Sequence, residues 1–198
     1  AMLRPEFWRC RPRTSGRQVR EVVVTMGGAD GLNLTPLVIE VLDALPSDFG
    51  VTVIIGPFFK NRSEIEAVVE RSHRSVNVVM DPDSISDLML AAGLVVSAGG
   101  QTLFELATTG APSVAVQVAE NQSRNLSEFS RHGVVSPVFA TSPAQLRNEL
   151  EDKLRLLLSN PELRQQMSTA GRDLVDGGGA LRCARIMFEL DPVEGLVN

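Results

Sequence analysis

Two glycine-rich segments contain the groups most able to bind an anion. The first is MGGADGLN at residues 26–33, and the second is SAGGQT at residues 97–102. Each follows a short β-branched run and leads into a helical pattern. Glycine lets backbone N–H groups approach an anion closely, and a helix N-terminus adds a partial positive charge. Together the two segments predict a diphosphate site that is built from backbone amides and needs no lysine.

Each glycine-rich segment also has an ordinary structural explanation, because strand-to-helix turns often use glycine for a positive φ. Neither segment matches G-x-G-x-x-G or the P-loop pattern G-x-x-x-x-G-K-[ST], which argues against dinucleotide and P-loop sites. Thr102 and Glu105 also fit a capping box, in which Glu105 would bond to the start of its own helix. The residues alone leave both a capping role and a ligand role open for Glu105.

Few residues could support acid–base or metal chemistry. The chain has two histidines, His73 and His132, and two cysteines that lie far apart, Cys10 and Cys183. His73 lies in a polar stretch and His132 precedes a glycine, which favours surface or capping roles for both. Asp30, in the first glycine-rich segment, is expected at a turn or a helix start. We therefore predict no catalytic residue, no metal site and no cofactor in this chain.

The elements that must position these segments alternate between strand and helix. Near-continuous apolar runs, typical of parallel strands covered on both faces, occur at residues 21–25, 51–55, 76–79, 94–96 and 113–116. Helical patterns occur at residues 34–45, 64–71, 85–92, 103–109, 121–132, 143–158, 162–174 and 180–190. Thr35 and Pro36 are expected to supply the N-cap and the first residue of the first helix.

This alternation predicts a doubly wound, Rossmann-like α/β domain with a parallel sheet. In the common strand order 3-2-1-4-5-6, the first and fourth strands are neighbours, and ligands bind beyond the carboxyl ends of the strands there. The two glycine-rich segments follow these two strands. We therefore expect them to face each other across a ligand-binding crevice.

The composition sets the class of protein. The chain has 198 residues, of which 43% are hydrophobic and 22% charged, and its net charge is −5. At about 150 residues per domain, this length predicts one domain. The acidic balance argues against an extended nucleic-acid surface, and no apolar run approaches the ~20 residues that span a bilayer. We expect a cytoplasmic, soluble protein with no nucleic-acid partner, no transmembrane segment and no secretory leader.

The charge is unevenly distributed along the chain. Residues 1–20 contain one acid, Glu6, and six arginines, namely Arg4, Arg9, Arg11, Arg13, Arg17 and Arg20. Subtracting them from the 19 basic and 24 acidic residues of the chain leaves 13 and 23, a formal charge of −10 for residues 21–198. Pro5, Trp8, Pro12 and Gly16 favour a connector over a nucleic-acid-binding arm. We expect an interdomain connector at residues 1–20 and a ligand-binding domain at residues 21–198.

The second glycine-rich segment and a later polar segment resemble a known signature. GGQTLFE at residues 99–105, followed by NQSRN at residues 121–125, looks like the G-x-x-T-x-x-E and Q-x-x-x-N signature of nucleotide-sugar-binding domains. These domains form the C-terminal halves of glycosyltransferases with two Rossmann-like domains, the GT-B class. A closer resemblance is to the UDP-sugar hydrolases of pseudaminic acid biosynthesis and their spore-coat polysaccharide relatives. It rests on LRPEF at residues 3–7, TMGGAD at 25–30 with NLT at 33–35, and IIGP at 54–57.

The resemblance implies roles for particular residues. The segment Gly99–Thr102 would bind the diphosphate, Glu105 the ribose hydroxyls, and the segment Met80–Ser84 the uracil. A carboxylate can accept two charge-assisted hydrogen bonds from a cis-diol. Gln101 stands where the hydrolases usually have serine. The complete set of expected UDP-sugar-binding residues is Gly27, Gly28, Asn33, Gly99, Gly100, Gln101, Thr102, Glu105, Asn121, Gln122 and Asn125.

By the same resemblance, the chain is the UDP-binding half of a nucleotide-sugar hydrolase. The catalytic histidine of that family lies in a G-x-G-H-x-x-R segment of an N-terminal domain, and no such segment occurs here. We therefore expect an N-terminal catalytic domain as a partner, and no hydrolase activity from this chain alone. One alternative is the donor-binding domain of a GT-B transferase, such as the peptidoglycan GlcNAc transferase. Another is a non-enzymatic nucleotide-sugar sensor or interaction domain.

Overall fold

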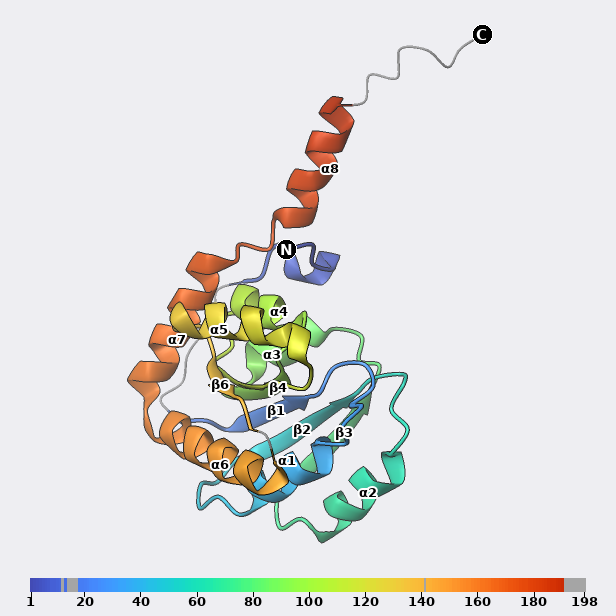
Figure 1. Cartoon of the computed structure of the whole chain (residues 1–198), viewed down its shortest axis with the longest axis vertical. Helices are drawn as coiled ribbons and strands as arrows, with labels where there is room; N and C mark the ends of the chain where they lie inside the picture. The colour runs from blue at the N-terminus through green and yellow to red at the C-terminus, as the bar shows by residue number, and fades with distance from the viewer. Residues whose placement is uncertain (12, 14–17, 141, 191–198) are drawn as a thin grey trace.

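A six-stranded parallel sheet forms the centre of the computed structural model, which describes residues 1–11, 13, 18–140 and 142–190 (Figure 1). The connector residues Pro12, Gly16 and Arg17 lie outside the described residues. The strand order is β3-β2-β1-β4-β5-β6, so the predicted fold and the predicted order are both confirmed. The strands are β1 (Glu21–Thr25), β2 (Gly50–Ile55), β3 (Val76–Met80), β4 (Leu94–Ala98), β5 (Ser113–Val116) and β6 (Ser136–Val138).

The central strands are buried almost throughout, as their apolar runs predict. The edge strand β3 is different, because Asn77 and Met80 are exposed and its other residues only partly buried. The expectation that both faces of all five runs are covered is therefore wrong for β3. The strand has one neighbour, β2, and it lies at the rim of the sheet.

The sixth strand, β6, does not follow from the apolar pattern. It has three residues, and Pro137 lies opposite Ala115 of β5. Proline lacks an N–H donor, so it is confined to edge strands or strand ends. β6 is the other edge of the sheet, where this proline is tolerated.

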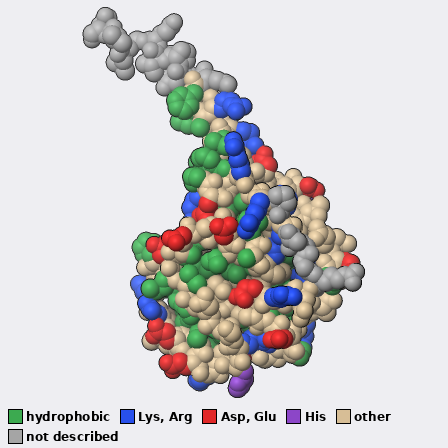
Figure 2. All heavy atoms as spheres, turned by 180° about the vertical axis from the view of Figure 1, so that it is seen from behind, with side chains coloured by type: hydrophobic (Ala, Val, Ile, Leu, Met, Phe, Trp, Pro, Cys, Tyr) green, Lys and Arg blue, Asp and Glu red, His purple; other side chains and the backbone are tan. Residues whose placement is uncertain are grey.

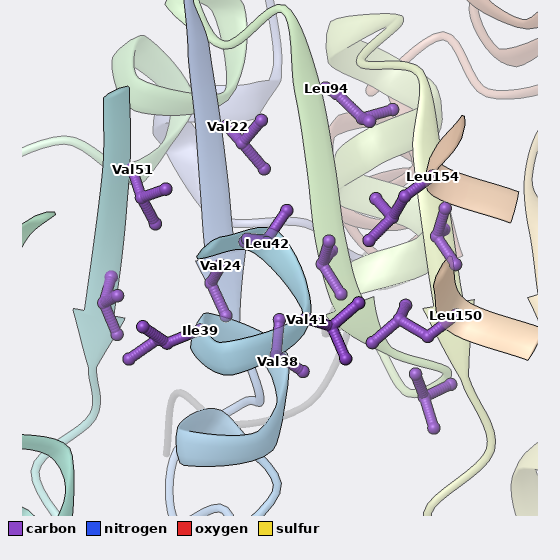
Figure 3. Packing of buried hydrophobic residues seen from close by; sticks show 14 of the residues in the cluster. Val22, Val24, Val38, Ile39, Val41, Leu42, Val51, Leu94, Leu150 and Leu154 are labelled. Carbon is purple, nitrogen blue, oxygen red and sulfur yellow. The ribbon is translucent and has the colours of Figure 1, made fainter. Parts of the chain in front are cut away.

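Helices cover both faces of the sheet. They are α1 (Thr35–Asp43), α2 (Arg62–Arg71), α3 (Ile85–Ala91), α4 (Thr102–Thr109), α5 (Ser123–Arg131), α6 (Pro143–Ser159), α7 (Pro161–Leu174) and α8 (Gly179–Leu190), with short 3-10 turns η1 (Pro5–Phe7) and η2 (Glu120–Gln122). The larger core cluster lies on one face, where Val22 and Val24 of β1 meet α1, and Leu150 and Leu154 of α6 join them (Figure 3). Val23 points to the opposite face, in the cluster that includes residues of α3 and α4. This alternation is the period of two expected of a strand.

The described part of the N-terminal arm packs against the domain itself. Leu3 and Phe7 are 5% and 0% exposed and belong to the same cluster as Val23 of β1. Arg13 donates from Nη1 to the carbonyls of Met89 and Leu90 at the end of α3, at 2.8 and 3.1 Å. The arm therefore runs along the α3–α4 face of the sheet.

The start of α1 differs from the predicted cap. Thr35 is the first helical residue and Leu34 holds the N-cap position, so Thr35 is not the N-cap. Asp30 takes the capping role from a distance, because its carboxylate accepts hydrogen bonds from the N–H groups of Leu34 (2.9 Å) and Thr35 (2.8 Å). Asp30 is buried and has φ 42°, which confirms the expected turn and helix-start role.

Helix α8 extends away from the body of the domain (Figure 1). Hydrophobic and basic side chains lie along this projection (Figure 2). The exposed fractions are 53% for Ile186, 70% for Met187 and 84% for Phe188. Among the described residues, no helix is both long and apolar enough to cross a membrane.

Candidate functional site

A cavity of about 250 Å³ lies at the carboxyl edge of the sheet. Strands β1 and β4 are adjacent and parallel, with Thr25 beside Ser97, so the loops that follow them leave the sheet at the same edge. The cavity is lined by residues of the loops after β1, β2 and β3, of α4 and of the N-terminal arm. Its lining comprises Arg4, Thr25, Gly27, Gly28, Ile54, Ile55, Gly56, Pro57, Asp81, Pro82, Ile85, Met89, Thr102 and Glu105.

The first glycine-rich loop contributes Gly27 and Gly28 to this cavity. Gly27 has φ 78°, a conformation that glycine adopts without strain. The carbonyl of Gly28 accepts a hydrogen bond of 3.1 Å from the N–H of Phe58, in the loop after β2. A Cβ atom on Gly56 would lie 2.5 Å from the same carbonyl oxygen. The two loops are thus packed backbone to backbone.

The second glycine-rich loop presents unpaired amides at the start of α4. The N–H of Gly99 is bonded to the carbonyl of Val116 at 2.8 Å, and is therefore committed to the neighbouring strand. The N–H groups of Gly100, Gln101 and Thr102 have no hydrogen-bond partner among the described residues. The first N–H groups of a helix have no partner within the helix, and anions bind such groups.

The carboxylate of Glu105 does not cap the N-terminus of its own helix, α4. The N-cap of α4 is Gln101, whose side chain makes no capping hydrogen bond, so Thr102 and Glu105 do not form the capping box that the sequence left open as one alternative. Instead, Glu105 Oε1 accepts a hydrogen bond of 3.2 Å from Arg4 Nη2. The Glu105 side chain is 14% exposed. Burial raises the pKa of this carboxyl above its usual value, and the charge and hydrogen bond of Arg4 act against that rise.

Gln122 lies against the second glycine-rich loop. A Cβ on Gly99 would lie 3.4 Å from Gln122 Oε1, and one on Gly100 would lie 3.6 Å from Gln122 Nε2. The same Oε1 accepts a hydrogen bond from the N–H of Val118 at 2.9 Å, which fixes the amide group. Asn121 and Asn125 are exposed. The cavity lining includes none of Asn121, Gln122 and Asn125, and of the second glycine-rich segment it includes only Thr102.

Asn33 is placed apart from the other expected residues. It lines a second, more apolar cavity of about 370 Å³ with Leu37, Val116 and Leu146 among its neighbours. Its Nδ2 donates to Glu64 Oε2 at 2.5 Å, whereas its buried Oδ1 has no partner within the described part of the chain. The segment expected near a uracil does reach the first cavity, through Asp81 and Pro82.

The histidines lie outside the cavity. His73 is exposed, and its backbone N–H bonds to Asp43. His132 is the exposed C-cap of α5 and precedes Gly133, which has φ 70°. These positions confirm the surface and capping roles predicted for them. Across the described residues, no group of three or more histidine, cysteine, aspartate or glutamate side chains could hold a metal ion.

Arg4 is a charged lining residue that the sequence did not indicate as part of a site. Arg4 lines the cavity and pairs with Glu105, yet its sequence context indicated only a connector. The available signal was its position between Leu3 and Phe7, two apolar residues that anchor the arm. Such anchoring would hold an intervening arginine at a defined place on the domain.

Relatives share parts of this chain. The spore coat polysaccharide biosynthesis protein SpsG of Bacillus subtilis is 24% identical over 192 residues, which cover 96% of this chain and 56% of that protein. The UDP-N-acetylglucosamine–N-acetylmuramyl-(pentapeptide) pyrophosphoryl-undecaprenol N-acetylglucosamine transferase of Xanthomonas oryzae is 31% identical over 185 residues, covering 89% and 41%. The pseudaminic acid cytidylyltransferase and UDP-2,4-diacetamido-2,4,6-trideoxy-beta-L-altropyranose hydrolase of Helicobacter pylori is 29% identical over 115 residues, covering 58% and 20%. The chain thus spans only part of the length of these relatives.

The crystal structure of MurG from Acinetobacter baumannii has the same fold, with a TM-score of 0.70 at 16% identity. The match covers 89% of this chain and 51% of that one. This fold, the relatives above and the family match of residues 22–176 together confirm the broad resemblance to the C-terminal half of GT-B enzymes. Residues 22–176 match the glycosyltransferase family 28 C-terminal domain, and the chain therefore belongs to that family.

Proposed function

We propose that this chain is the UDP-binding half of a nucleotide-sugar enzyme. The observation that carries the proposal is the cavity at the carboxyl edge, which is lined by Thr102 at the start of α4 and by the largely buried side chain of Glu105. The N–H groups of Gly100, Gln101 and Thr102, which have no partner among the described residues, lie at that helix start. In doubly wound sheets, ligands bind at this topological switch point. The family match, the UDP-N-acetylglucosamine transferase and the UDP-sugar hydrolase among the relatives support a UDP-sugar as the ligand.

Each part of the ligand has a chemically matched partner in this proposal. The N–H groups of Gly100, Gln101 and Thr102 bind the diphosphate, and Gly27 and Gly28 of the first glycine-rich loop line the same cavity as Thr102. Glu105 accepts hydrogen bonds from the ribose hydroxyls, and Asp81 with its neighbour Pro82 borders the base.

The sugar lies beyond the diphosphate in this arrangement. Gln122 is the best placed of the expected amide side chains, since it contacts Gly99 and Gly100. Asn121 and Asn125 are more exposed, and would contact only the part of the sugar that lies farthest from the diphosphate. Asn33, which lines the other cavity, is the weakest candidate for direct contact.

The small volume of the cavity and the exposed apolar residues around it suit a ligand site that a second domain completes. Its volume of about 250 Å³ is below the roughly 300–1,000 Å³ usual for a complete ligand pocket. Leu32, Phe58 and Met80 are large hydrophobic residues that are exposed at or beside the loops after β1, β2 and β3. A second domain that closes over this edge, supplied by the same polypeptide, would cover them and complete the site.

The reaction we propose is hydrolysis of the UDP-sugar. Water attacks the anomeric carbon, the bond from that carbon to the diphosphate oxygen breaks, and UDP leaves as the free sugar forms. The amides at the start of α4 stabilise the charge that develops on the leaving diphosphate, an effect that is often large. The base that accepts the proton from water belongs to the other domain. The hydrolase of Helicobacter pylori among the relatives supports this reading.

Transfer to an acceptor hydroxyl is the second candidate reaction. The 31% identity to the Xanthomonas transferase over 89% of this chain favours it. Binding of UDP by this half would be the same in both reactions. An assay of the full natural protein separates them, since a hydrolase releases UDP from the UDP-sugar without any added acceptor, whereas a transferase requires one.

Calorimetric titration of this chain with UDP tests the proposed ligand. We expect saturable binding that Glu105→Ala weakens by about 1.5–3 kcal/mol, roughly ten- to hundredfold in Kd, because charge-assisted hydrogen bonds are lost. The matched control is Glu151→Ala, which removes a partly exposed glutamate from an arginine pair on α6. Equal affinities for the Glu105→Ala variant and the unmodified chain would remove Glu105 from the site. An absence of UDP binding would contradict the proposal as a whole.

A further inference from the structure

Arg4 links the N-terminal arm to the carboxylate that the proposed function assigns to the ribose. Its Nη2 lies 3.2 Å from Glu105 Oε1, and its Nη1 lies 3.1 Å from Glu6 Oε1. The two paired residues Arg4 and Glu105 are 101 positions apart in the sequence. The arginine also lines the candidate cavity, so it borders the space in which a nucleoside would lie.

The backbone of Arg4 is held in place on both sides. Leu3 and Phe7 are buried in the core beneath η1, and the N–H of Phe7 bonds to the carbonyl of Arg4 at 3.0 Å. Trp8 Nε1 donates to the carbonyl of Leu3 at 2.7 Å. The Arg4 side chain is 51% exposed. An anchored backbone with an accessible charged group suits a residue that orients another side chain.

The two acids beside Arg4 are used differently. Glu6 Oε2 accepts hydrogen bonds from the N–H of Ser86 (3.0 Å) and the hydroxyl of Ser84 (3.4 Å), so Glu6 is bound to the start of α3. Glu105 Oε2 has no hydrogen-bond partner among the described residues. Arg4 therefore holds one oxygen of Glu105 and leaves the second available to a ligand.

We propose that Arg4 is a positioning residue that orients Glu105 for recognition of the ribose cis-diol. The inference rests on the proposed function, since it assigns Arg4 a role in the same nucleotide site. It makes docking of the N-terminal arm a condition for discriminating a ribonucleotide from a 2′-deoxyribonucleotide.

The charges around Glu105 give this role a pH signature. Burial raises the pKa of Glu105, Arg4 lowers it and Glu6 raises it, while Asp81 adds a further acid to the cavity lining. Removal of Arg4 therefore raises the pKa of Glu105 further. A protonated carboxyl loses acceptor capacity. The loss of diol recognition on acidification is then expected to begin at a higher pH than in the unmodified chain.

The test compares the affinities of this chain for UDP and 2′-deoxy-UDP by calorimetry between pH 5 and 8. The ratio of the two Kd values isolates the 2′-hydroxyl, because both ligands carry the same diphosphate. We expect a ratio of about ten in the unmodified chain, a ratio near one in Arg4→Ala, and an intermediate ratio in Arg4→Lys, whose ammonium lacks the planar guanidinium fork. Arg155→Ala, which breaks an exposed arginine–glutamate pair on α6, is the matched control and should keep the full ratio.

Each result has a separate meaning. A ratio near one in Arg4→Ala, together with circular dichroism and urea unfolding like those of the unmodified chain, supports the proposal. An unchanged ratio with both affinities lowered in parallel would overturn it, since Arg4 would then contact the diphosphate. If Arg4→Ala does not fold, the Arg4→Lys variant provides the test. The inference is then overturned if the ratio of the two Kd values in Arg4→Lys equals that of the unmodified chain at every pH.

If the unmodified chain binds no UDP, the proposed function fails, and the role of Arg4 fails with it. If it binds UDP without discriminating the 2′-hydroxyl, only the assignment of Glu105 and Arg4 to the ribose fails.

Discussion

At the scale of single residues, backbone contacts shape the candidate site as much as side chains do. Gly56 and Gly28 approach so closely that a side chain on Gly56 would collide with the Gly28 backbone. That contact sets the position of the first glycine-rich loop relative to the loop after β2. Asp30 acts in the same loop, where it binds two N–H groups at the start of α1.

Replacement of Gly56 by alanine is expected to disturb both loops. The added Cβ would meet the Gly28 oxygen at 2.5 Å and its Cα at 2.6 Å, and neither backbone atom can move as a flexible side chain would. We expect a loss of about 1–3 kcal/mol in the free energy of unfolding, as for other overpacked sites, and weaker UDP binding. Urea unfolding and calorimetry measure the two effects. Gly31→Ala is the control, because a Cβ there meets nothing within 4 Å; equal behaviour of the two variants would contradict the prediction.

Replacement of Asp30 by alanine removes the distant cap of α1. We expect the free energy of unfolding to fall by about 0.5–2 kcal/mol, the range measured for lost N-caps. Urea denaturation followed by circular dichroism measures the change. Asp152→Ala on the exposed surface of α6 provides the comparison. A stability of Asp30→Ala equal to that of the control would show that these two hydrogen bonds contribute little.

At the scale of elements, most helices bury one face against the sheet, whereas α8 does not. Leu150 and Leu154 of α6 are fully buried, while Met187 and Phe188 of α8 are among the most exposed hydrophobic residues described. Because burial of apolar surface is the main source of stability, α6 contributes to the fold of this domain and the apolar face of α8 adds little. That face is available to another part of the protein, which agrees with the proposed second domain.

Polar substitutions on α8 are therefore expected to leave this chain as stable as before. The double variant Met187→Ser, Phe188→Ser should change the free energy of unfolding by no more than about 0.5 kcal/mol, as surface substitutions usually do. Leu154→Ala should cost about 2–5 kcal/mol, because it leaves a cavity in the core. Chemical denaturation compares the two. A loss in the α8 variant similar to that in Leu154→Ala would mean that α8 packs on the domain.

At the scale of the whole molecule, the domain gathers groups suited to anion binding at one edge of its sheet. The cavity is lined by amide-bearing loops and by Glu105, which is paired with Arg4. Neither histidine lines it. The relatives extend well beyond the part that matches this chain. The proposed division of labour assigns the leaving UDP to this domain and the attacking group to the other.

This division predicts that the isolated chain does not hydrolyse a UDP-sugar. The purified chain should release no more UDP than buffer alone in a coupled assay, because the proposed base is supplied by the other domain. The Glu105→Ala variant shows whether any residual signal comes from the site. UDP release by the unmodified chain that is abolished in this variant would contradict the prediction.

The element order was predictable because it depends on local pattern. Apolar runs and helical periodicity repeat within a few residues, and the chirality and connection rules for parallel sheets restrict the topology. The 3-2-1-4-5-6 order follows from those rules, and so does the placement of Gly27, Gly28 and Thr102 at one cavity. Strand β6 was not recognised, because three residues that include Pro137 carry too little pattern.

The sequence by itself therefore determined the fold class and the edge of the sheet at which the two glycine-rich segments lie. The tertiary structure alone decided which side chains meet there. It paired Glu105 with Arg4 across 101 positions, where the local pattern favoured a capping box equally, and it placed Asn33 in a different cavity. The physical reason is range: secondary structure and strand order arise from short-range periodicity, whereas a side-chain pair depends on the packing of elements that lie far apart in the sequence.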